Sequence, residues 1–256
     1  MTNKKLISFD LKADFGFFKK PDINDGLYLT YNMLHKPALL GIIGAIAGLQ
    51  GYQKNGELPE YYCKLKNLKV GIEPLNSDKG NYTKDIVKYN NAVGYANCDA
   101  GILNPQEQFL IKPAYRCYLL LNIDDEIENK LYQNLESNKA EFLPYMGKND
   151  FSAWWDDFKD YNYSSFDFSS DYNISSIFAK TEAVRGYVAK NMSMFAASTE
   201  PTWLYFEKLP IGFNEDLYQY DYADFVYSNA KFLKEMNMSE AGFFYKIEKN
   251  KIIQLF

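Results

Sequence analysis

The segment from Tyr31 to Tyr52, YNMLHKPALLGIIGAIAGLQGY, constrains the fold more than any other part of the chain. It predicts an almost wholly apolar helix, in which four small residues share one face at 3.6 residues per turn: Gly41, Gly44, Ala45 and Gly48. A glycine inside a helix costs about 1 kcal/mol relative to alanine. Three of them therefore indicate a helix face that another backbone, a sheet or a ligand approaches closely.

The start of this helix is predicted to be an anion site. His35 and Lys36 precede Pro37, a residue preorganised for the first helical position. Free N–H groups and the positive end of the helix dipole would suit a phosphate there. The apolar run 38–49 is shorter than the roughly 20 residues needed to cross a bilayer, and no signal-peptide cleavage pattern follows it. We expect a cytoplasmic protein with no membrane partner.

The composition argues against several kinds of site. Cys63, Cys98 and Cys117 lie far apart without a C-x-x-C pair, which disfavours disulfides and thiolate metal sites. His35 is the only histidine, so neither the usual zinc site nor paired-histidine catalysis is expected. Nucleotide-binding loops, the hydrolase elbow and the zinc-protease motif are absent from the sequence. We expect no metal, no cofactor and no small-molecule substrate.

Charge is unevenly distributed along the chain, whose net charge is −5. Residues 1–123 hold 15 Lys and Arg against 11 Asp and Glu, whereas residues 124–256 hold 13 against 22. A basic half joined to an acidic half fits a protein that touches a polyanion on one side and protein on the other. Ordinary solvated charge is the alternative for any single lysine.

The periodicity of the first half predicts alternating strands and helices. Strands are expected at 5–14, 65–75 and 114–122. The acidic pair Asp124-Asp125 predicts the cap of a helix that runs to about residue 138. Together with the apolar helix, this order is most of a split βαβ or ferredoxin-like half.

The remaining segments are an insertion and a β-rich end. Residues 76–104 are too long for an ordinary connection and have few large aliphatic side chains, so we expect them to add little to the core. After a turn at 143–149 the sequence favours strands, and it closes with a predicted hairpin around residues 249–251.

Five motifs, in order, resemble the Cas-five family of CRISPR-associated RAMP proteins from type I effector complexes, and type I-B most closely. They are FDLKADFGFFKKP, YNMLHKPALLGIIGAIAGL, EQFLIKPAYRCYLLL, LPYMGKND, and LPIGF followed by FYKIEKNKIIQL. The resemblance covers nearly the whole chain. It implies an α+β fold: a modified ferredoxin-like, RRM-related domain at 1–148, with 76–104 as its thumb, and a β-rich region at 149–256.

The resemblance also implies a function. Such a protein is an RNA-binding subunit of Cascade in antiviral defence, which caps the 5′ handle of the crRNA beside the large subunit and the backbone subunit. Single-stranded RNA is held by bases on aromatic platforms and by cations along the phosphates. The candidate RNA-binding residues are Phe17, Lys19, Lys20, Tyr28, Tyr31, His35, Lys36, Arg116, Tyr145, Gly147 and Lys148. A salt bridge is the alternative for Arg116, and core packing for each aromatic taken alone.

Catalysis is the runner-up function. Type I-C members of this family cleave the CRISPR repeat with a set of Tyr, Lys and His. In this sequence His35 stands alone at a helix entrance. We therefore expect a non-catalytic scaffold with no catalytic residues, and a metal-independent endoribonuclease using His35 is the alternative.

Overall fold

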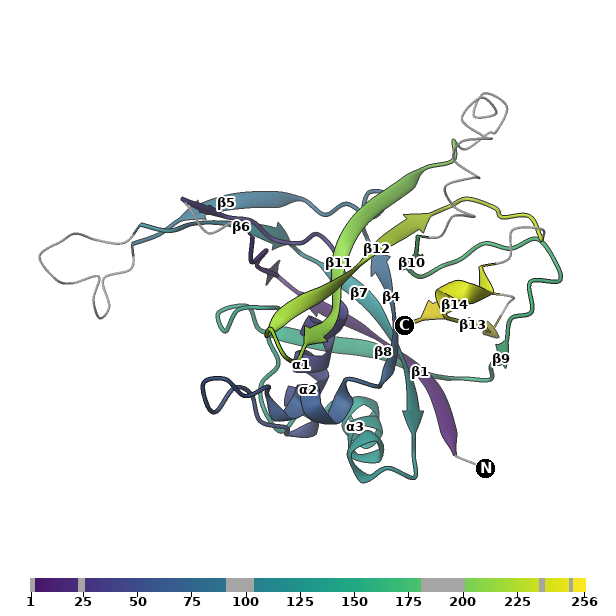
Figure 1. The fold of residues 1–256 in the computed structure, drawn as a ribbon, viewed down its shortest axis with the longest axis horizontal. Helices are drawn as coiled ribbons and strands as arrows, with labels where there is room; N and C mark the ends of the chain where they lie inside the picture. The colour runs from purple at the N-terminus through teal and green to yellow at the C-terminus, as the bar shows by residue number, and fades with distance from the viewer. Residues whose placement is uncertain (1–2, 23–25, 91–103, 181–200, 235–237, 249–250) are drawn as a thin grey trace, which may run out of the picture.

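The computed structural model describes residues 3–22, 26–90, 104–180, 201–234, 238–248 and 251–256 (Figure 1). Over these ranges the chain is a mixed α/β fold, rich in strands and poor in helices. None of the helices in the described ranges is long and apolar enough to span a membrane.

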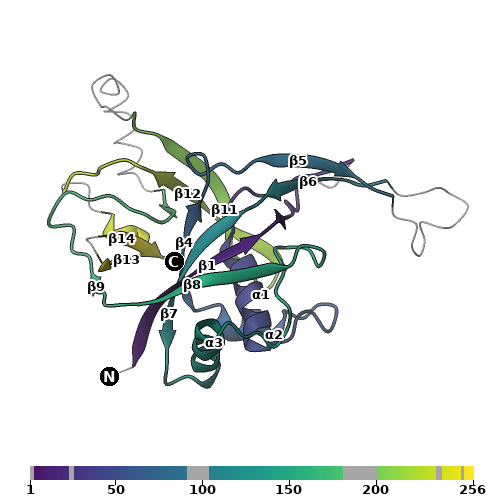
Figure 2. The same cartoon turned by 180° about the vertical axis from the view of Figure 1, so that it is seen from behind.

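A four-stranded antiparallel sheet in the order β4-β7-β1-β8 forms the centre of the molecule (Figures 1 and 2). Two helices pack on one of its faces, one connecting β1 to β4 and the other connecting β7 to β8. The elements are β1 (Lys4–Ala13), α1 (Lys36–Ala47), β4 (Lys69–Leu75), β7 (Ala114–Asn122), α3 (Glu126–Glu136) and β8 (Ala153–Tyr161). The chain order of this unit is therefore β-α-β-β-α-β.

Alternation along β1 explains why the central sheet is buried on both faces. Ile7 and Phe9 point into the main core beneath the helices. Leu6 points to the opposite face, where it packs with Ile253 and Leu255 from the last strand. The strands predicted at 5–14 and 114–122 are confirmed. The strand predicted at 65–75 begins later because a short helix, α2 (Glu60–Leu65), precedes it.

The glycine-rich helix is shorter than the predicted segment and ends at identifiable signals. His35 caps its start, Pro37 occupies the first turn, and Gly48 ends it in the left-handed conformation with φ +86°. The close neighbour predicted for its glycine face is α2. A Cβ placed on Gly44 would overlap the Cβ of Tyr61, so only glycine allows the two helices to approach this closely.

The insertion forms a hairpin that projects from the body of the molecule (Figure 1). β5 (Lys84–Lys88) pairs with β6 (Gln106–Ile111), whose other edge meets β2 (Phe15–Gly16) and β3 (Leu27–Tyr28). The expectation that this insertion adds little to the core is wrong for the residues at the base of the hairpin. Tyr82 is only 6% exposed, and its hydroxyl donates to the carbonyls of Leu75 and Ala114. Residues 91–103 lie outside the described ranges.

The C-terminal part is β-rich, as predicted. β11 (Leu204–Asn214) and β12 (Gln219–Ser228) form a long hairpin joined by β10 (Phe178–Ala179). The remaining elements are β9 (Ser164–Ser165), the turn η2 (Ser239–Ala241), β13 (Phe243–Lys246) and β14 (Ile252–Leu255). The closing hairpin is confirmed by the antiparallel pairing of β13 and β14, although residues 249–250 of its turn lie outside the described ranges. Because β8 belongs to the central sheet, the expected division after residue 148 passes through that sheet.

Candidate nucleic-acid interface

A cavity of about 470 Å³ lies over the first turns of α1; we call it the α1 cavity. Its floor is the small-residue face of the helix, at Ala38, Gly41 and Ala45. The sequence predicted this face as a place of close approach, and the structure divides it between two uses. Gly44 admits helix α2 and Gly48 lies against Glu141, whereas Gly41 and Ala45 line the cavity.

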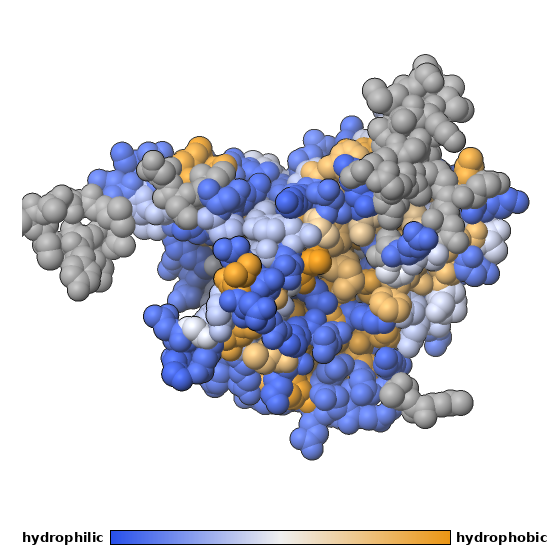
Figure 3. Space-filling model, viewed as in Figure 1, coloured by the Kyte–Doolittle hydropathy of each residue, from blue (hydrophilic) through white to orange (hydrophobic). Residues whose placement is uncertain are grey.

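The walls of the α1 cavity are aromatic and come from distant parts of the chain. Phe18 follows β1, Tyr61 lies on α2, and Tyr145 lies in the turn before β8. Phe213 and Tyr220 come from the tip of the β11–β12 hairpin, where their rings stack at 4.8 Å between centroids. Apolar surface is visible near this hairpin tip, among hydrophilic side chains, in Figure 3. No acidic side chain lines the α1 cavity among the described residues.

His35 lies at the N-terminal end of α1 and lines the α1 cavity. Its backbone is extended, and its Nδ1 accepts a hydrogen bond from the N–H of Ala38 at 3.3 Å, which caps the helix. The side chain is 4% exposed and is enclosed by the rings of Phe18, Tyr31 and Tyr220 at 5.3–5.7 Å. Burial lowers the pKa of His35 to about 3. The ring is therefore neutral near pH 7, with its proton on Nε2.

The segment leading to the cavity carries two cations without carboxylate partners among the described residues. Lys19 lies 3.9 Å from the ring of Tyr28, and Lys20 lies 5.1 Å from the ring of Tyr31. Lys19 lines the α1 cavity and is exposed. Backbone hydrogen bonds between residues 18–20 and 29–31 hold this segment in place. Lys19 is thus available to a phosphate at the edge of the cavity, and Lys20 adds positive charge next to it in the sequence.

Lys36 is not available to RNA, which corrects its prediction as a phosphate ligand. It is buried, and its Nζ donates to the backbone carbonyl of Phe256 at 3.2 Å. Burial lowers its pKa to about 8. The prediction of a charged anion site at the start of α1 is therefore wrong, because Lys36 is buried against Phe256 and His35 caps the helix as a neutral ring. Phe17 and Tyr31 are likewise core residues.

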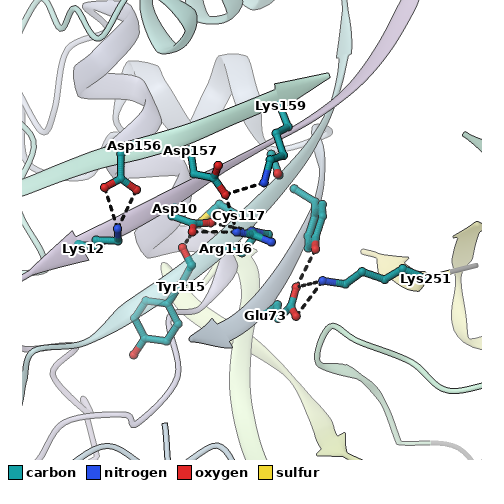
Figure 4. A network of polar contacts seen from close by, with 12 residues as sticks. Asp10, Lys12, Glu73, Tyr115, Arg116, Cys117, Asp156, Asp157, Lys159 and Lys251 are labelled. Atoms are coloured by element: carbon teal, nitrogen blue, oxygen red, sulfur yellow. Dashed lines mark hydrogen bonds and ion pairs between the residues drawn. The ribbon is translucent and has the colours of Figure 1, made fainter. Parts of the chain in front are cut away.

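Arg116 lies in an ion-pair network (Figure 4). This agrees with the salt bridge that was given as the alternative to RNA binding. Its guanidinium donates to both carboxylate oxygens of Asp10, at 2.7 and 2.8 Å, and to Asp157 at 2.7 Å. The hydrogen bond to Asp10 raises the pKa of Arg116 still further. Nearby, Lys12 pairs with Asp156. The sheet face opposite the helices is thus closed by ion pairs here and by the β13–β14 hairpin beside them.

The turn at 145–148 contains one exposed side chain and two residues that contact other parts of the protein. Tyr145 is exposed and lines the α1 cavity. Gly147 adopts φ +82° and lies against the backbone carbonyl of Phe17, leaving no room for a Cβ. The Nζ of Lys148 donates to the buried Glu107 at 2.7 Å. Of this predicted group, Tyr145 and Gly147 line the α1 cavity, and Lys148 does not.

Sequence reasoning missed Tyr61, Phe213 and Tyr220. The glycine face of α1 was the one local signal that something approaches the helix. No pattern within residues 204–228 identifies which of their aromatic side chains would reach that face. Their role depends on how the β11–β12 hairpin folds over α1, an arrangement that strands far along the chain decide (Figure 1).

No family model and no curated protein matches the sequence. Among solved structures, the chain is similar to a CRISPR protein from Archaeoglobus fulgidus, at 12% identity and a TM-score of 0.48, with 98% of each chain covered. It is similar to a chain of a CRISPR RNA-guided surveillance complex, at 11% identity and a TM-score of 0.45, with 90% of this chain and 92% of that chain covered.

A third similar structure is a chain of the type III-B Cmr-beta complex bound to cognate target RNA and AMPPnP. The identity is 10% and the TM-score 0.48, with 98% of this chain and 99% of that chain covered. The structural neighbours thus include CRISPR-associated proteins at low sequence identity. TM-scores below 0.5 define no family for this chain.

Proposed function

We propose that this chain is a non-catalytic RNA-binding subunit of a type I CRISPR effector complex, nearest to type I-B, which caps the 5′ handle of the crRNA. The observation that carries the proposal is the α1 cavity, an open site with aromatic walls and with Lys19 in its lining, next in sequence to Lys20. Aromatic platforms for bases beside cations for phosphates are what single-stranded RNA requires.

Topology supports the same proposal. The β-α-β-β-α-β order and the strand order β4-β7-β1-β8 support the ferredoxin-like domain that the sequence resemblance implies. The β5–β6 hairpin emerges between the second and third strands of this unit, where the thumb is expected. These features agree with five motifs that resemble one family in order along the chain.

The projecting hairpin supports contact with a neighbouring subunit. β5 is an edge strand, and Ile86 and Val87 on it are 51% and 39% exposed. Exposed apolar side chains on an edge strand form a surface suited to pairing with another chain. We propose that this hairpin contacts the backbone subunit of the complex. Replacing both residues with serine should reduce co-purification with that subunit and leave the monomer folded.

The state of His35 supports a role without catalysis. A histidine that acts as a general acid must hold a transferable proton as imidazolium near neutral pH, whereas burial lowers the pKa of His35 to about 3. A base catalyst needs a free nitrogen, whereas Nδ1 accepts the capping hydrogen bond and Nε2 carries the proton. These features disfavour the alternative of an endoribonuclease that uses His35.

The proposal is tested with purified protein and labelled repeat RNA from the host CRISPR array. Fluorescence anisotropy should show tighter binding to RNA with the handle at its 5′ end than to the same RNA with the handle moved to its 3′ end. A denaturing gel of the same mixture should show intact RNA. Equal affinity for the two RNAs would overturn the capping role, and a cleavage product would overturn the non-catalytic role.

A further inference from the structure

We infer that the α1 cavity holds one unstacked nucleobase of the bound RNA, and that Nε2–H of His35 donates a hydrogen bond to an acceptor on the edge of that base. This inference rests on the proposed RNA binding. It adds the position of a single base and the side chain that reads it.

An unpartnered donor at the cavity carries the inference. Nδ1 of His35 accepts from the Ala38 N–H, so the ring proton is on Nε2. Among the described residues Nε2 has no hydrogen-bond partner, although the side chain is 96% buried. Every side-chain nitrogen or oxygen that is fully enclosed in the described part of the chain does have a partner. Nε2 must therefore reach open space, and the open space that His35 lines is the α1 cavity.

This donor favours a ligand that presents an acceptor. A bound group that supplies an acceptor to this donor gains a hydrogen bond as well as its own packing contacts. Because the imidazole is neutral near pH 7, it favours an uncharged acceptor over a phosphate. Ring nitrogens and carbonyl oxygens of nucleobases are such acceptors.

The shape of the site favours a flat ring. The floor at Ala38, Gly41 and Ala45 carries no long side chain, and the walls are the rings of Tyr61 and Phe213 with their neighbours. A volume of about 470 Å³ lies in the range of roughly 300–1,000 Å³ that is usual for small-ligand sites. Bases stack favourably on aromatic side chains, whatever their sequence.

The surroundings favour a base attached to a strand of RNA over an aromatic side chain of a protein partner. Phe18 contacts His35 at 5.7 Å between ring centroids, and the next two residues along the chain are Lys19 and Lys20. A base placed against His35 would therefore lie in the same cavity as Lys19, which can meet its phosphates. A protein side chain would leave these lysines without a counter-charge.

The test uses two variants that alter the cavity in different ways. His35→Asn keeps a side chain that caps helices well, but it lacks the ring that carries the donor into the cavity. Ala38→Phe fills the cavity from the floor and leaves His35 in place. Asp125→Asn is the matched control, because Asp125 caps α3 in the same manner and does not line the cavity.

Each protein is titrated by fluorescence anisotropy with guide RNAs that carry one abasic nucleotide at successive positions. In the parent protein and in Asp125→Asn, one position should weaken binding at least fivefold when its base is removed. In His35→Asn and in Ala38→Phe, removal of that same base should change binding less than twofold, because these variants no longer hold the base.

The outcomes separate this inference from the function on which it rests. If intact RNA binds and no abasic position matters, the cavity holds no base, while the RNA-binding role stands. If no RNA binds, both proposals fall. If RNA binding is unchanged in the cavity variants but co-purification with a partner subunit is lost, the cavity takes a protein side chain and the inference is overturned.

Discussion

At the scale of single residues, His35 shows how burial changes the role of a titratable group. The sequence suggests a cation for phosphate, whereas the structure holds a neutral helix cap among aromatic rings. Its pKa of about 3 lies below the usual value of 6.5. The unfolded chain therefore takes up the proton first as the pH falls, and stability is lost from about pH 6.5 downward.

This linkage predicts a pH-dependent difference between the parent protein and His35→Asn. Between pH 7 and pH 4.5, the free energy of unfolding of the parent should fall by roughly 2–3 kcal/mol more than that of the variant. The reason is that the variant has no imidazole to protonate, while all other groups titrate in both proteins. Urea titrations at several pH values measure the difference, and parallel pH profiles would contradict the prediction.

Arg116 is the second residue whose role depends on its partners. Arg116→Gln leaves the buried carboxylate of Asp10 without its forked donor, and the free energy of unfolding should fall by about 3–5 kcal/mol. Lys159→Gln is the control, since its pair with Asp157 is exposed and contributes no more than about 1 kcal/mol. Denaturant unfolding of both variants tests this, and an effect confined to RNA affinity would mean that Arg116 contacts RNA after all.

At the scale of elements, the contact between α1 and α2 separates two glycines that look equivalent in the sequence. A Cβ on Gly44 would overlap Tyr61, whereas a Cβ on Gly41 would lie at an ordinary 3.6 Å from the ring of Tyr61. We expect Gly44→Ala to lower the free energy of unfolding by about 1–3 kcal/mol despite its better helix propensity, and Gly44→Leu to lower it further. Gly41→Ala should be neutral or gain up to about 1 kcal/mol. Thermal melts compare them, and equal effects would show that the two helices do not pack this closely.

The inserted hairpin has a base that belongs to the core and an exposed strand beyond it. Tyr82→Phe removes the donor to two carbonyls, so the free energy of unfolding should fall by about 1–2 kcal/mol. Ile86→Ser, at an exposed position of β5, should change it by less than about 0.5 kcal/mol. A thermal melt in which Tyr82→Phe matches the parent would restore the expectation that the whole insertion lies outside the core.

At the scale of the whole molecule, the basic and acidic halves neutralise each other in part. Among the described residues, six ion pairs join the two halves. In four of them a cation of residues 1–123 meets a carboxylate of residues 124–256: Lys5–Asp160, Lys12–Asp156, Lys66–Glu215 and Arg116–Asp157. Ion pairs within the fold therefore neutralise part of the charge difference between the two halves. The lysines that remain beside the α1 cavity are those of the loop after β1.

These lysines give the electrostatic prediction. Changing Lys19 and Lys20 to glutamate should weaken RNA binding and flatten its salt dependence, by roughly 0.7 in the logarithmic slope for each phosphate that is no longer neutralised. The same change at Lys231 and Lys234, which lie on the acidic half and near Asp171, should have a much smaller effect. Anisotropy titrations at several salt concentrations measure both. Equal slopes for the two double variants would mean that RNA lies elsewhere.

The sequence by itself determined those features that depend on neighbouring residues. Alternation predicted β1, a buried apolar run predicted β7, turn residues predicted the closing hairpin, and Asp125 marked the start of α3. These signals are local because propensity, capping and side-chain alternation act over a few residues. The glycines of α1 also predicted a helix face that another part of the chain or a ligand approaches closely.

Only the tertiary structure decided what approaches that face and which charged groups stay free. Tyr61 covers Gly44, while the floor of the α1 cavity remains open beneath rings from the β11–β12 hairpin. Arg116 pairs with Asp10 and Asp157, which are 106 and 41 residues away in the sequence. The physical reason is that burial and ion pairing are properties of segments brought together across the sheet. The residue types alone therefore could not tell a ligand-binding cation from a core ion pair.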